Sequence, residues 1–159
     1  YAVDEAVEAL KEYGAVAGLV DIGGEIRCFG NPPGEKYYTV GLQDPAADDN
    51  IMMLLELKDK AVATSGNYRR FVFIDGKRYS HIMDPAAAGS SNGLDSVSII
   101  SDSAMTADSL ATAVSVLGTR EGLELIENLS GTEAIIIPSG NSQEVIKTSG
   151  AGAYIVPKL

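Results

Sequence analysis

The fold class of this 159-residue chain is decided by a stretch in its middle, Phe71-Val72-Phe73-Ile74-Asp75-Gly76-Lys77-Arg78-Tyr79-Ser80-His81-Ile82. Asp75-Gly76 between two β-forming runs is typical of a β-hairpin, because a tight turn of the primed type needs positive φ at its central residues. Similar runs, joined by short turns rather than by crossover helices, recur along the chain. The pattern predicts an α+β fold with a largely antiparallel sheet and helices packed against it, not a doubly wound parallel sheet.

Working outward from this hairpin, apolar runs predict further strands on both sides of it. These strands are expected at residues 15–22, 25–29, 37–42, 51–57, 97–100, 134–137, 144–148 and 154–156. Apolar residues at helical spacing predict a first helix that ends at Gly14 and a second over 104–117 that ends at Gly118. A third helix is expected over 120–128, with Thr119 as its N-cap. The small and polar residues at 63–67 and 84–93 predict a turn and a loop.

The composition limits the classes of function. The chain is 45% hydrophobic and 21% charged, which at this length predicts one domain with a substantial core. Twenty-two acidic residues against 12 Lys and Arg give a net charge of −10, which argues against binding to nucleic acid or to an anionic membrane surface. The single cysteine, Cys28, cannot form an internal disulfide, and the sequence has no Cys/His set suited to structural zinc.

Asp108 and Thr112 stand four residues apart in the helix predicted over 104–117, and therefore share one face of it. A carboxylate and a hydroxyl are hard oxygen ligands that suit Mg²⁺, especially where substrate phosphates and water complete its shell. A structural role fits them too, since an early acidic residue favours the helix dipole and a threonine can hydrogen-bond to the preceding turn. The spacing alone leaves both interpretations open.

Other candidate site residues lie near the ends of predicted strands. His81, the one histidine, could act as a base near neutral pH, or could be satisfied by backbone hydrogen bonds. The predicted turn at 63–67, which contains Ser65 and Gly66, could hold a phosphate on its backbone N–H groups or be an ordinary polar turn. Gly23-Gly24 indicates a bend or bulge at a strand end, with close approach of a ligand as the alternative.

Taken in order, several sequence blocks resemble the ApbE family of FAD:protein FMN transferases. The resemblance runs from Tyr1 to about Leu125. Any one block is modest, but the ordered set is specific. The blocks are Tyr1-Ala2-Val3-Asp4, Leu19-Val20-Asp21-Ile22-Gly23-Gly24-Glu25-Ile26, Val40-Gly41-Leu42-Gln43-Asp44-Pro45, Ala63-Thr64-Ser65-Gly66-Asn67-Tyr68, Asp75-Gly76-Lys77-Arg78-Tyr79-Ser80-His81-Ile82-Met83-Asp84-Pro85, Ser96-Val97-Ser98-Ile99-Ile100 and Ala107-Asp108-Ser109-Leu110-Ala111-Thr112-Ala113.

The resemblance implies an activity and roles for individual residues. It implies that Asp108 and Thr112 bind Mg²⁺, and that the enzyme transfers FMN from FAD onto a threonine of an acceptor protein and releases AMP. His81 becomes the candidate to accept the threonine proton, and Ile82 the candidate to line the FAD site. Ser65 and Gly66 are the remaining candidates for contact with FAD, and Tyr68 and Tyr79 could pack on its rings. Hydrolysis of FAD to FMN and AMP, flavin binding without turnover, and a structural fragment with a decayed site are the alternatives.

Two departures from the family pattern affect these expectations. The family usually reads Asp-Pro-Arg-Thr-Gly after the histidine block, whereas here Asp84-Pro85 is followed by Ala86-Ala87-Ala88-Gly89. The family's upstream half is also missing, and the chain begins within the first turn of an amphipathic helix without an initiator Met. We therefore expect residues 1–159 to be the C-terminal portion of one larger catalytic domain, with the N-terminal fragment as a partner if the chain was cleaved. Family members are often exported lipoproteins, so the resemblance also implies a membrane-anchored, extracytoplasmic location in the bacterial periplasm or at the cell surface.

Overall fold

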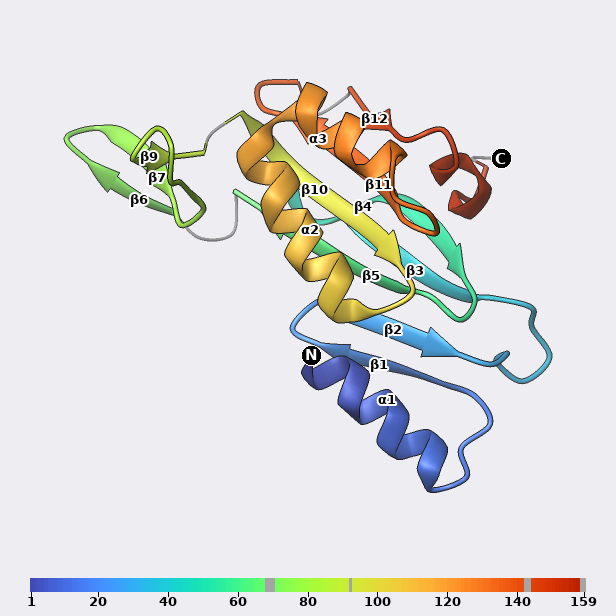
Figure 1. Cartoon of the computed structure of the whole chain (residues 1–159). Coiled ribbons are helices and arrows are strands. Elements are labelled where there is room, and N and C mark those ends of the chain that lie inside the picture. The colour runs from blue at the N-terminus through green and yellow to red at the C-terminus, as the bar shows by residue number, and fades with distance from the viewer. Residues whose placement is uncertain (68–70, 92, 142–143, 158–159) are drawn as a thin grey trace.

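A six-stranded antiparallel sheet forms the centre of the molecule (Figure 1). The computed structural model describes residues 1–67, 71–91, 93–141 and 144–157. Neighbouring strands of the sheet pair antiparallel throughout, which confirms the predicted fold class. In spatial order the strands are β1 (Gly18–Ile22), β2 (Glu25–Phe29), β5 (Ala61–Gly66), β10 (Leu94–Ser101), β11 (Glu133–Pro138) and β12 (Ile146–Lys147).

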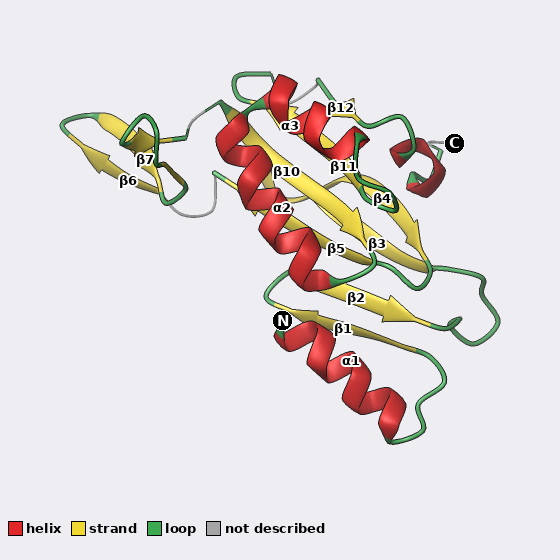
Figure 2. Ribbon diagram, in the orientation of Figure 1, coloured by secondary structure: helices red, strands yellow, loops and turns green. Residues whose placement is uncertain are grey.

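Helices cover one face of this sheet, and a long hairpin covers the other (Figure 2). The helices are α1 (Ala2–Glu12), α2 (Ala104–Leu117) and α3 (Thr119–Glu127), and the hairpin consists of β3 (Tyr38–Asp44) and β4 (Ala47–Leu57). Side chains of β10 point to both faces of the sheet: Val97 and Ile99 pack against the helices, and Ile100 packs against the hairpin. The apolar run at 97–100 is therefore a strand buried on both faces.

The first helix is fastened to the start of α2 by one carboxylate. Asp4 accepts hydrogen bonds from the backbone N–H groups of Ala104 and Met105, each at 2.9 Å, and pairs with Arg27 at 3.0 Å. Burial alone raises the pKa of Asp4, but the two backbone donors and Arg27 outweigh it, so the pKa is lowered overall. Asp4 thus supplements the N-cap of α2, where Ser103 Oγ accepts from the Thr106 N–H at 3.2 Å.

A separate arm, residues 71–91, projects beyond the C-terminal end of α2 (Figure 1). Its first hairpin pairs β6 (Phe71–Ile74) with β7 (Lys77–Ser80), and both turn residues have positive φ, 50° at Asp75 and 76° at Gly76. The hairpin predicted from Asp75-Gly76 is confirmed. Residues 84–93 were predicted as a loop, which is wrong in part, because β8 (Met83–Asp84) and β9 (Gly89–Ser90) form a second short hairpin. Asp84 closes its turn by accepting from the Ala86 N–H at 2.8 Å.

Three other predictions from the sequence need correction. Residues 63–66 are the end of strand β5 rather than a turn, because their small side chains let α2 pack directly on the sheet. The last predicted strand, 154–156, is replaced by the 3₁₀ helix η1 (Ala151–Tyr154), and Ile155 makes only an isolated bridge to Leu55. Thr119 is the first residue of α3 rather than its cap, a position that Gly118 occupies with φ 81°.

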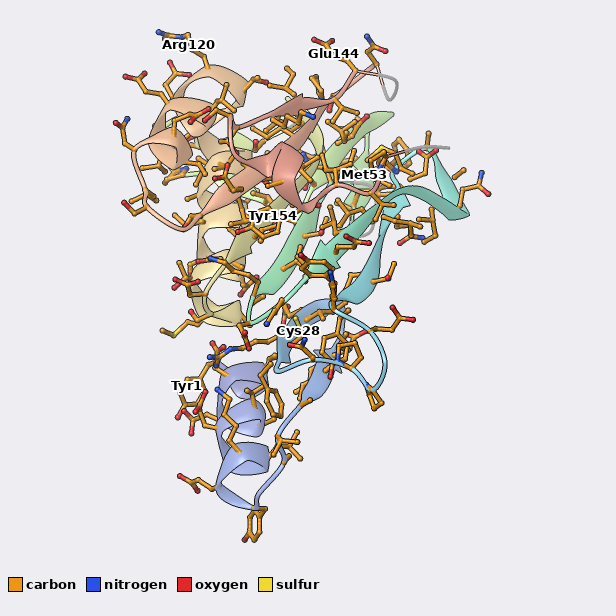
Figure 3. The ribbon with its side chains drawn as sticks, turned by 90° about the vertical axis from the view of Figure 1, so that its right-hand side faces the viewer. Tyr1, Cys28, Met53, Arg120, Glu144 and Tyr154 are labelled. Carbon is orange, nitrogen blue, oxygen red and sulfur yellow. The ribbon has the colours of Figure 1, made fainter. Side chains whose placement is uncertain are left out.

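Cys28 is buried on β2 (Figure 3), where its thiol donates to the Lys60 carbonyl at 3.3 Å, and burial raises the pKa of this thiol. Tyr154 and Met53, also labelled in Figure 3, pack at the margin of the core between the sheet and the β3–β4 hairpin. Within the described residues, no helix is both long enough and apolar enough to cross a bilayer.

Candidate functional site

Asp108 and Thr112 lie on the exposed face of α2. Both side chains are exposed, while Ala107, Ala111 and Val114 turn the opposite face of the helix into the core. The helix spacing thus placed the two oxygen-bearing groups together on one face, as predicted, and that face is open rather than packed in hydrocarbon.

Ser65 on β5 joins this pair from the neighbouring strand. Its Oγ lies 3.4 Å from Thr112 Oγ1, because Ala61, Ala63 and Ser65 alternate onto the side of β5 that faces α2. Gly66 is buried and pairs through its backbone with Ser96 of β10. The structure therefore brings Ser65 to Thr112, whereas Gly66 offers only backbone groups.

A cavity of about 450 Å³ lies on the other face of the sheet, between the β1–β2 turn, the β3–β4 hairpin and β5. Val62 and Thr64 of β5 line it, so the cavity and Ser65 are on opposite faces of the same strand. In the described residues, β2 pairs with β5 at Ala61 and Val62 and not further along β5. Beyond Val62, the edge of β5 that faces β2 therefore lies between the α2 face and the cavity without a strand paired to it in the described residues.

Gly23-Gly24 forms the tight turn between β1 and β2 at the mouth of this cavity. Both glycines have positive φ, 71° and 97°, and Asp21 Oδ1 accepts from the Gly24 N–H at 2.9 Å. The predicted bend is confirmed, and both glycines also line the cavity, as do Asp21 and Glu25. Acidic residues in the lining disfavour phosphate, so this cavity suits an uncharged ring or a sugar better than a phosphate.

His81 and Ile82 come from the arm. The His81 side chain is exposed, and Ile82 is 6% exposed. The backbone around them is held on both sides, because the Ile82 N–H donates to Ser80 Oγ at 3.2 Å and the Ile82 carbonyl accepts from the Ser91 N–H at 2.9 Å. Tyr79 is half-buried on β7, and Tyr68 lies outside the described residues.

The oxygen ligands available for a metal ion are few. Among the described residues, no group of three or more His, Cys, Asp or Glu side chains is arranged to hold a metal. Asp108 and Thr112 supply two hard oxygen donors one turn apart, which fits part of a Mg²⁺ shell completed by phosphate oxygens and water. Further ligands have to come from groups beyond this pair.

Sequence reasoning missed one part of the site, the buried side chain of Asn67. Asn67 is 5% exposed and hydrogen-bonds to the arm and to the start of β10. Its place in the stretch 63–67, which the sequence predicts as a polar turn, concealed it. An asparagine that follows a small-residue strand carries no pattern that marks it as buried, so only the tertiary structure could identify it.

Comparison with known proteins gives a consistent result. The family model described as the ApbE family matches residues 1–136. The chain is similar to the FAD:protein FMN transferase of Vibrio cholerae, with 36% identity over 129 residues that cover 80% of this chain and 39% of that protein. It is also similar to the FAD:protein FMN transferase of Treponema pallidum, with 33% identity over 147 residues that cover 86% of this chain and 41% of that protein.

Solved structures show the same relationship. The crystal structure of the ApbE protein from Thermotoga maritima superposes with a TM-score of 0.89 and 31% identity, covering 99% of this chain and 51% of that one. The apo form of the Pseudomonas stutzeri flavinyl transferase ApbE gives a TM-score of 0.81 and 32% identity, covering 100% of this chain and 50% of that one. The chain spans half or less than half the length of the curated relatives it matches.

Proposed function

The chain belongs to the ApbE family, and from that premise we propose that the complete protein transfers FMN from FAD onto a threonine of an acceptor protein and releases AMP. The observation that carries the proposal is the exposed pair Asp108 and Thr112, with Ser65 Oγ 3.4 Å from Thr112 Oγ1. The relatives from Vibrio cholerae and Treponema pallidum carry the name FAD:protein FMN transferase. Because this chain spans half their length or less, the activity is assigned to the complete protein.

The proposed reaction is a displacement at phosphorus. The threonine oxygen of the acceptor forms a bond to the phosphorus of the FMN half of FAD. The bond between that phosphorus and the oxygen that bridges to the AMP half breaks, and AMP leaves with that oxygen. The hydroxyl proton passes to a base. Such a reaction depends on placing the nucleophile and on stabilising charge at the phosphoryl oxygens.

Asp108 and Thr112 are proposed to hold Mg²⁺, with the diphosphate of FAD and water as its other ligands. When bound, the ion would offset negative charge on the diphosphate. The chemistry of this pair fits, since a carboxylate and a hydroxyl are the oxygen ligands that Mg²⁺ prefers. Ser65 would orient the Thr112 hydroxyl toward the ion through the contact between their oxygens.

His81 is proposed to accept the threonine proton. Its imidazole is exposed at the end of β7 and its backbone neighbours are held by hydrogen bonds, so it can meet the hydroxyl of a second protein. The imidazole nitrogen of a histidine can accept a proton from a hydroxyl and so act as a general base. Ile82 beside it and the backbone at Gly66 are proposed to contact FAD, and the cavity on the β3–β4 side is proposed to take an uncharged part of that molecule.

The test measures AMP release and covalent flavin on an acceptor domain, with full-length protein, FAD and Mg²⁺. Asp108→Asn keeps the shape of the side chain and removes its charge, so we expect a loss of about 100-fold or more in the rate of AMP release. Chelation of Mg²⁺ with EDTA should have a comparable effect. Glu124→Gln on α3 also removes an exposed charge and should leave the rate within about twofold. Equal rates in the Asp108→Asn and Glu124→Gln proteins would contradict the assignment.

Hydrolysis of FAD is the second candidate, because the exposure of His81 admits water as well as the hydroxyl of a second protein. Water would then replace the threonine hydroxyl as the nucleophile, and the same bond would break. This alternative predicts AMP and free FMN in the absence of any acceptor, at a rate that the acceptor does not change. Transfer predicts that AMP and protein-bound flavin form in equal amounts only when the acceptor is present.

A further inference from the structure

A buried polar network connects the arm to the sandwich of helices and sheet. At its centre is Asn67, which follows β5 and is 5% exposed. Its Nδ2 donates to the carbonyls of Ser91, at 2.9 Å, and Leu94, at 2.6 Å. Its Oδ1 accepts from Ser80 Oγ. One amide thus hydrogen-bonds to both ends of the segment from Ser80 to Ser91 and to the first residue of β10.

Ser80, at the end of β7, links Asn67 to the residues that follow Ser80 in the chain. It is 4% exposed, and its Oγ, which donates to Asn67, also accepts from the Ile82 N–H at 3.2 Å. Its backbone is held by Ser90, whose Oγ accepts from the Ser80 N–H at 2.6 Å and donates to the Ser80 carbonyl at 3.2 Å. His81 therefore stands between two residues whose backbone positions are fixed.

The same network reaches the helix that carries the metal candidates. Ser91 Oγ donates to the carbonyl of Ser115 in the last turn of α2. Two residues before Asn67 along the chain, Ser65 contacts Thr112 of the same helix. Asn67 is thus linked by hydrogen bonds to the segment that carries His81, and it follows Ser65, which contacts α2, by two residues.

We propose that Asn67 and Ser80 are a positioning pair, which holds the His81–Ile82 segment in place relative to Asp108 and Thr112. This inference rests on the proposed function. Neither residue needs to touch FAD or the acceptor, because each acts through the backbone of the segment it holds. A displacement of about 1 Å in a reacting group costs about 100-fold in rate, so such a pair matters for turnover.

The chemistry of an amide explains why asparagine occupies this position. Asn67 donates to two carbonyls through its amide nitrogen and accepts from a hydroxyl through its amide oxygen. Aspartate has the same shape, but its carboxylate would face the Ser91 and Leu94 carbonyls with oxygen against oxygen. Asn67→Asp therefore breaks the network without leaving a cavity. Ser80→Ala is the milder change, because it removes one hydroxyl and leaves Asn67 in place.

The experiment combines kinetics with hydrogen exchange in the full-length protein. For Ser80→Ala we expect kcat for AMP release to fall about tenfold or more, while KM for FAD stays within about threefold because the hydroxyl that is removed is not itself placed against FAD. Exchange of backbone amides in 80–91, measured by mass spectrometry, should quicken about tenfold, while exchange in 133–138 stays unchanged. Asn67→Asp should show the same pattern with larger changes.

Ser101→Ala is the matched control. Ser101 is also 4% exposed and also bonds to another side chain, Thr132, but it lies at the opposite end of β10. This variant should leave kcat within about twofold and exchange in the arm unchanged. An equal fall of kcat in Ser101→Ala and Ser80→Ala would show a general effect of lost stability and overturn the proposal.

The remaining outcomes are also decisive. Faster exchange with unchanged kcat would overturn the positioning role, and unchanged exchange in 80–91 would show that the pair does not hold the segment. A rise in KM with unchanged kcat would assign the pair to FAD binding instead and would likewise overturn it. If the wild-type protein releases no AMP from FAD, the proposed function fails, and the exchange data still report whether Asn67 and Ser80 hold the arm.

Discussion

Ile136 on β11 and Ile74 on β6 are both isoleucines, but one strand is buried and the other is exposed. Ile136 is fully buried between the sheet and the helices, whereas Ile74 is 54% exposed, as are its neighbours in β6 to a similar degree. Burial of apolar surface therefore holds the sandwich together, while β6 of the arm leaves its apolar side chains exposed and the base of the arm is linked to the sandwich by the hydrogen bonds of Asn67, Ser80 and Ser91. The candidate site takes Asp108 and Thr112 from the first region and His81 from the second. Changes in the sandwich should then act on stability, and changes at the base of the arm on turnover.

The largest expected effect on stability is in the sandwich. Ile136→Ala removes a side chain that is 0% exposed within the core of the helix face. We expect the free energy of unfolding to fall by about 2–5 kcal/mol, the range for large-to-small changes in packed cores. Urea denaturation checks it. A loss below about 1 kcal/mol would mean that this layer is packed more loosely than the structure indicates.

The next effect tests how closely α3 approaches α2. A Cβ at Gly122 would lie 2.6 Å from Cγ1 of Val114. Gly122→Ala should therefore destabilise the protein by about 1–3 kcal/mol through overpacking, although alanine in place of glycine usually favours a helix. The double variant with Val114→Ala should show favourable coupling between the two sites in a double-mutant cycle. If the two changes are additive, the helices do not meet at this contact.

A smaller effect concerns the carboxylate that fastens α1 to α2. The pKa of Asp4 is lowered, so its contribution to stability is present above the pKa of the unfolded chain and is lost as the pH falls through the folded value. Asp4→Asn should cost about 1 kcal/mol at neutral pH, as loss of a helix cap does. Below the ordinary aspartate value of 3.8 the difference between the two proteins should shrink. Thermal unfolding across this pH range checks the prediction, and a constant difference would contradict it.

The smallest effect is expected on the arm. Ile74→Ala removes the same atoms as Ile136→Ala, but from a side chain that is 54% exposed. We expect a change in the free energy of unfolding of no more than about 0.5 kcal/mol. Because the two substitutions are chemically identical, urea denaturation of both proteins measures the contrast between the regions. Comparable losses would show that the arm contributes to the main cooperative core.

Much of the sandwich could be predicted from local pattern. The helix at 104–117 has apolar residues on one face and a glycine directly after it, and both ends agree with the structure. The hairpin at Asp75-Gly76 was predictable because its tight turn needs two residues with positive φ, and both residues have it. In both cases the local sequence and the tertiary structure favour the same conformation, which is why a single sequence sufficed.

The errors occurred where tertiary contacts override local preference. Thr64-Ser65-Gly66 has the composition of a turn, yet pairing with β10 and packing under α2 make it a strand. The predicted loop at 84–93 is rich in small residues, yet residues 83–90 form a short hairpin that hydrogen bonds link to neighbouring segments. Strand propensity depends largely on such partners, so composition alone could not predict either result.

The candidate site was predictable in part. The spacing of Asp108 and Thr112 placed them on one face, but only the structure shows that this face is exposed and that Ser65 meets it. The contribution of Asn67 was not predictable, because its partners come from distant parts of the chain.

The central claim is that the exposed face of α2 binds a divalent ion together with the nucleotide. Mn²⁺, which also prefers oxygen ligands, can replace Mg²⁺ and be followed by electron paramagnetic resonance as it is titrated into full-length protein with FAD present. We expect one bound ion, and we expect its binding to require FAD. Its affinity should fall about tenfold or more in Asp108→Asn, where an oxygen ligand loses its charge, and stay unchanged in Glu124→Gln. Equal Mn²⁺ affinity in the wild-type and Asp108→Asn proteins would contradict it.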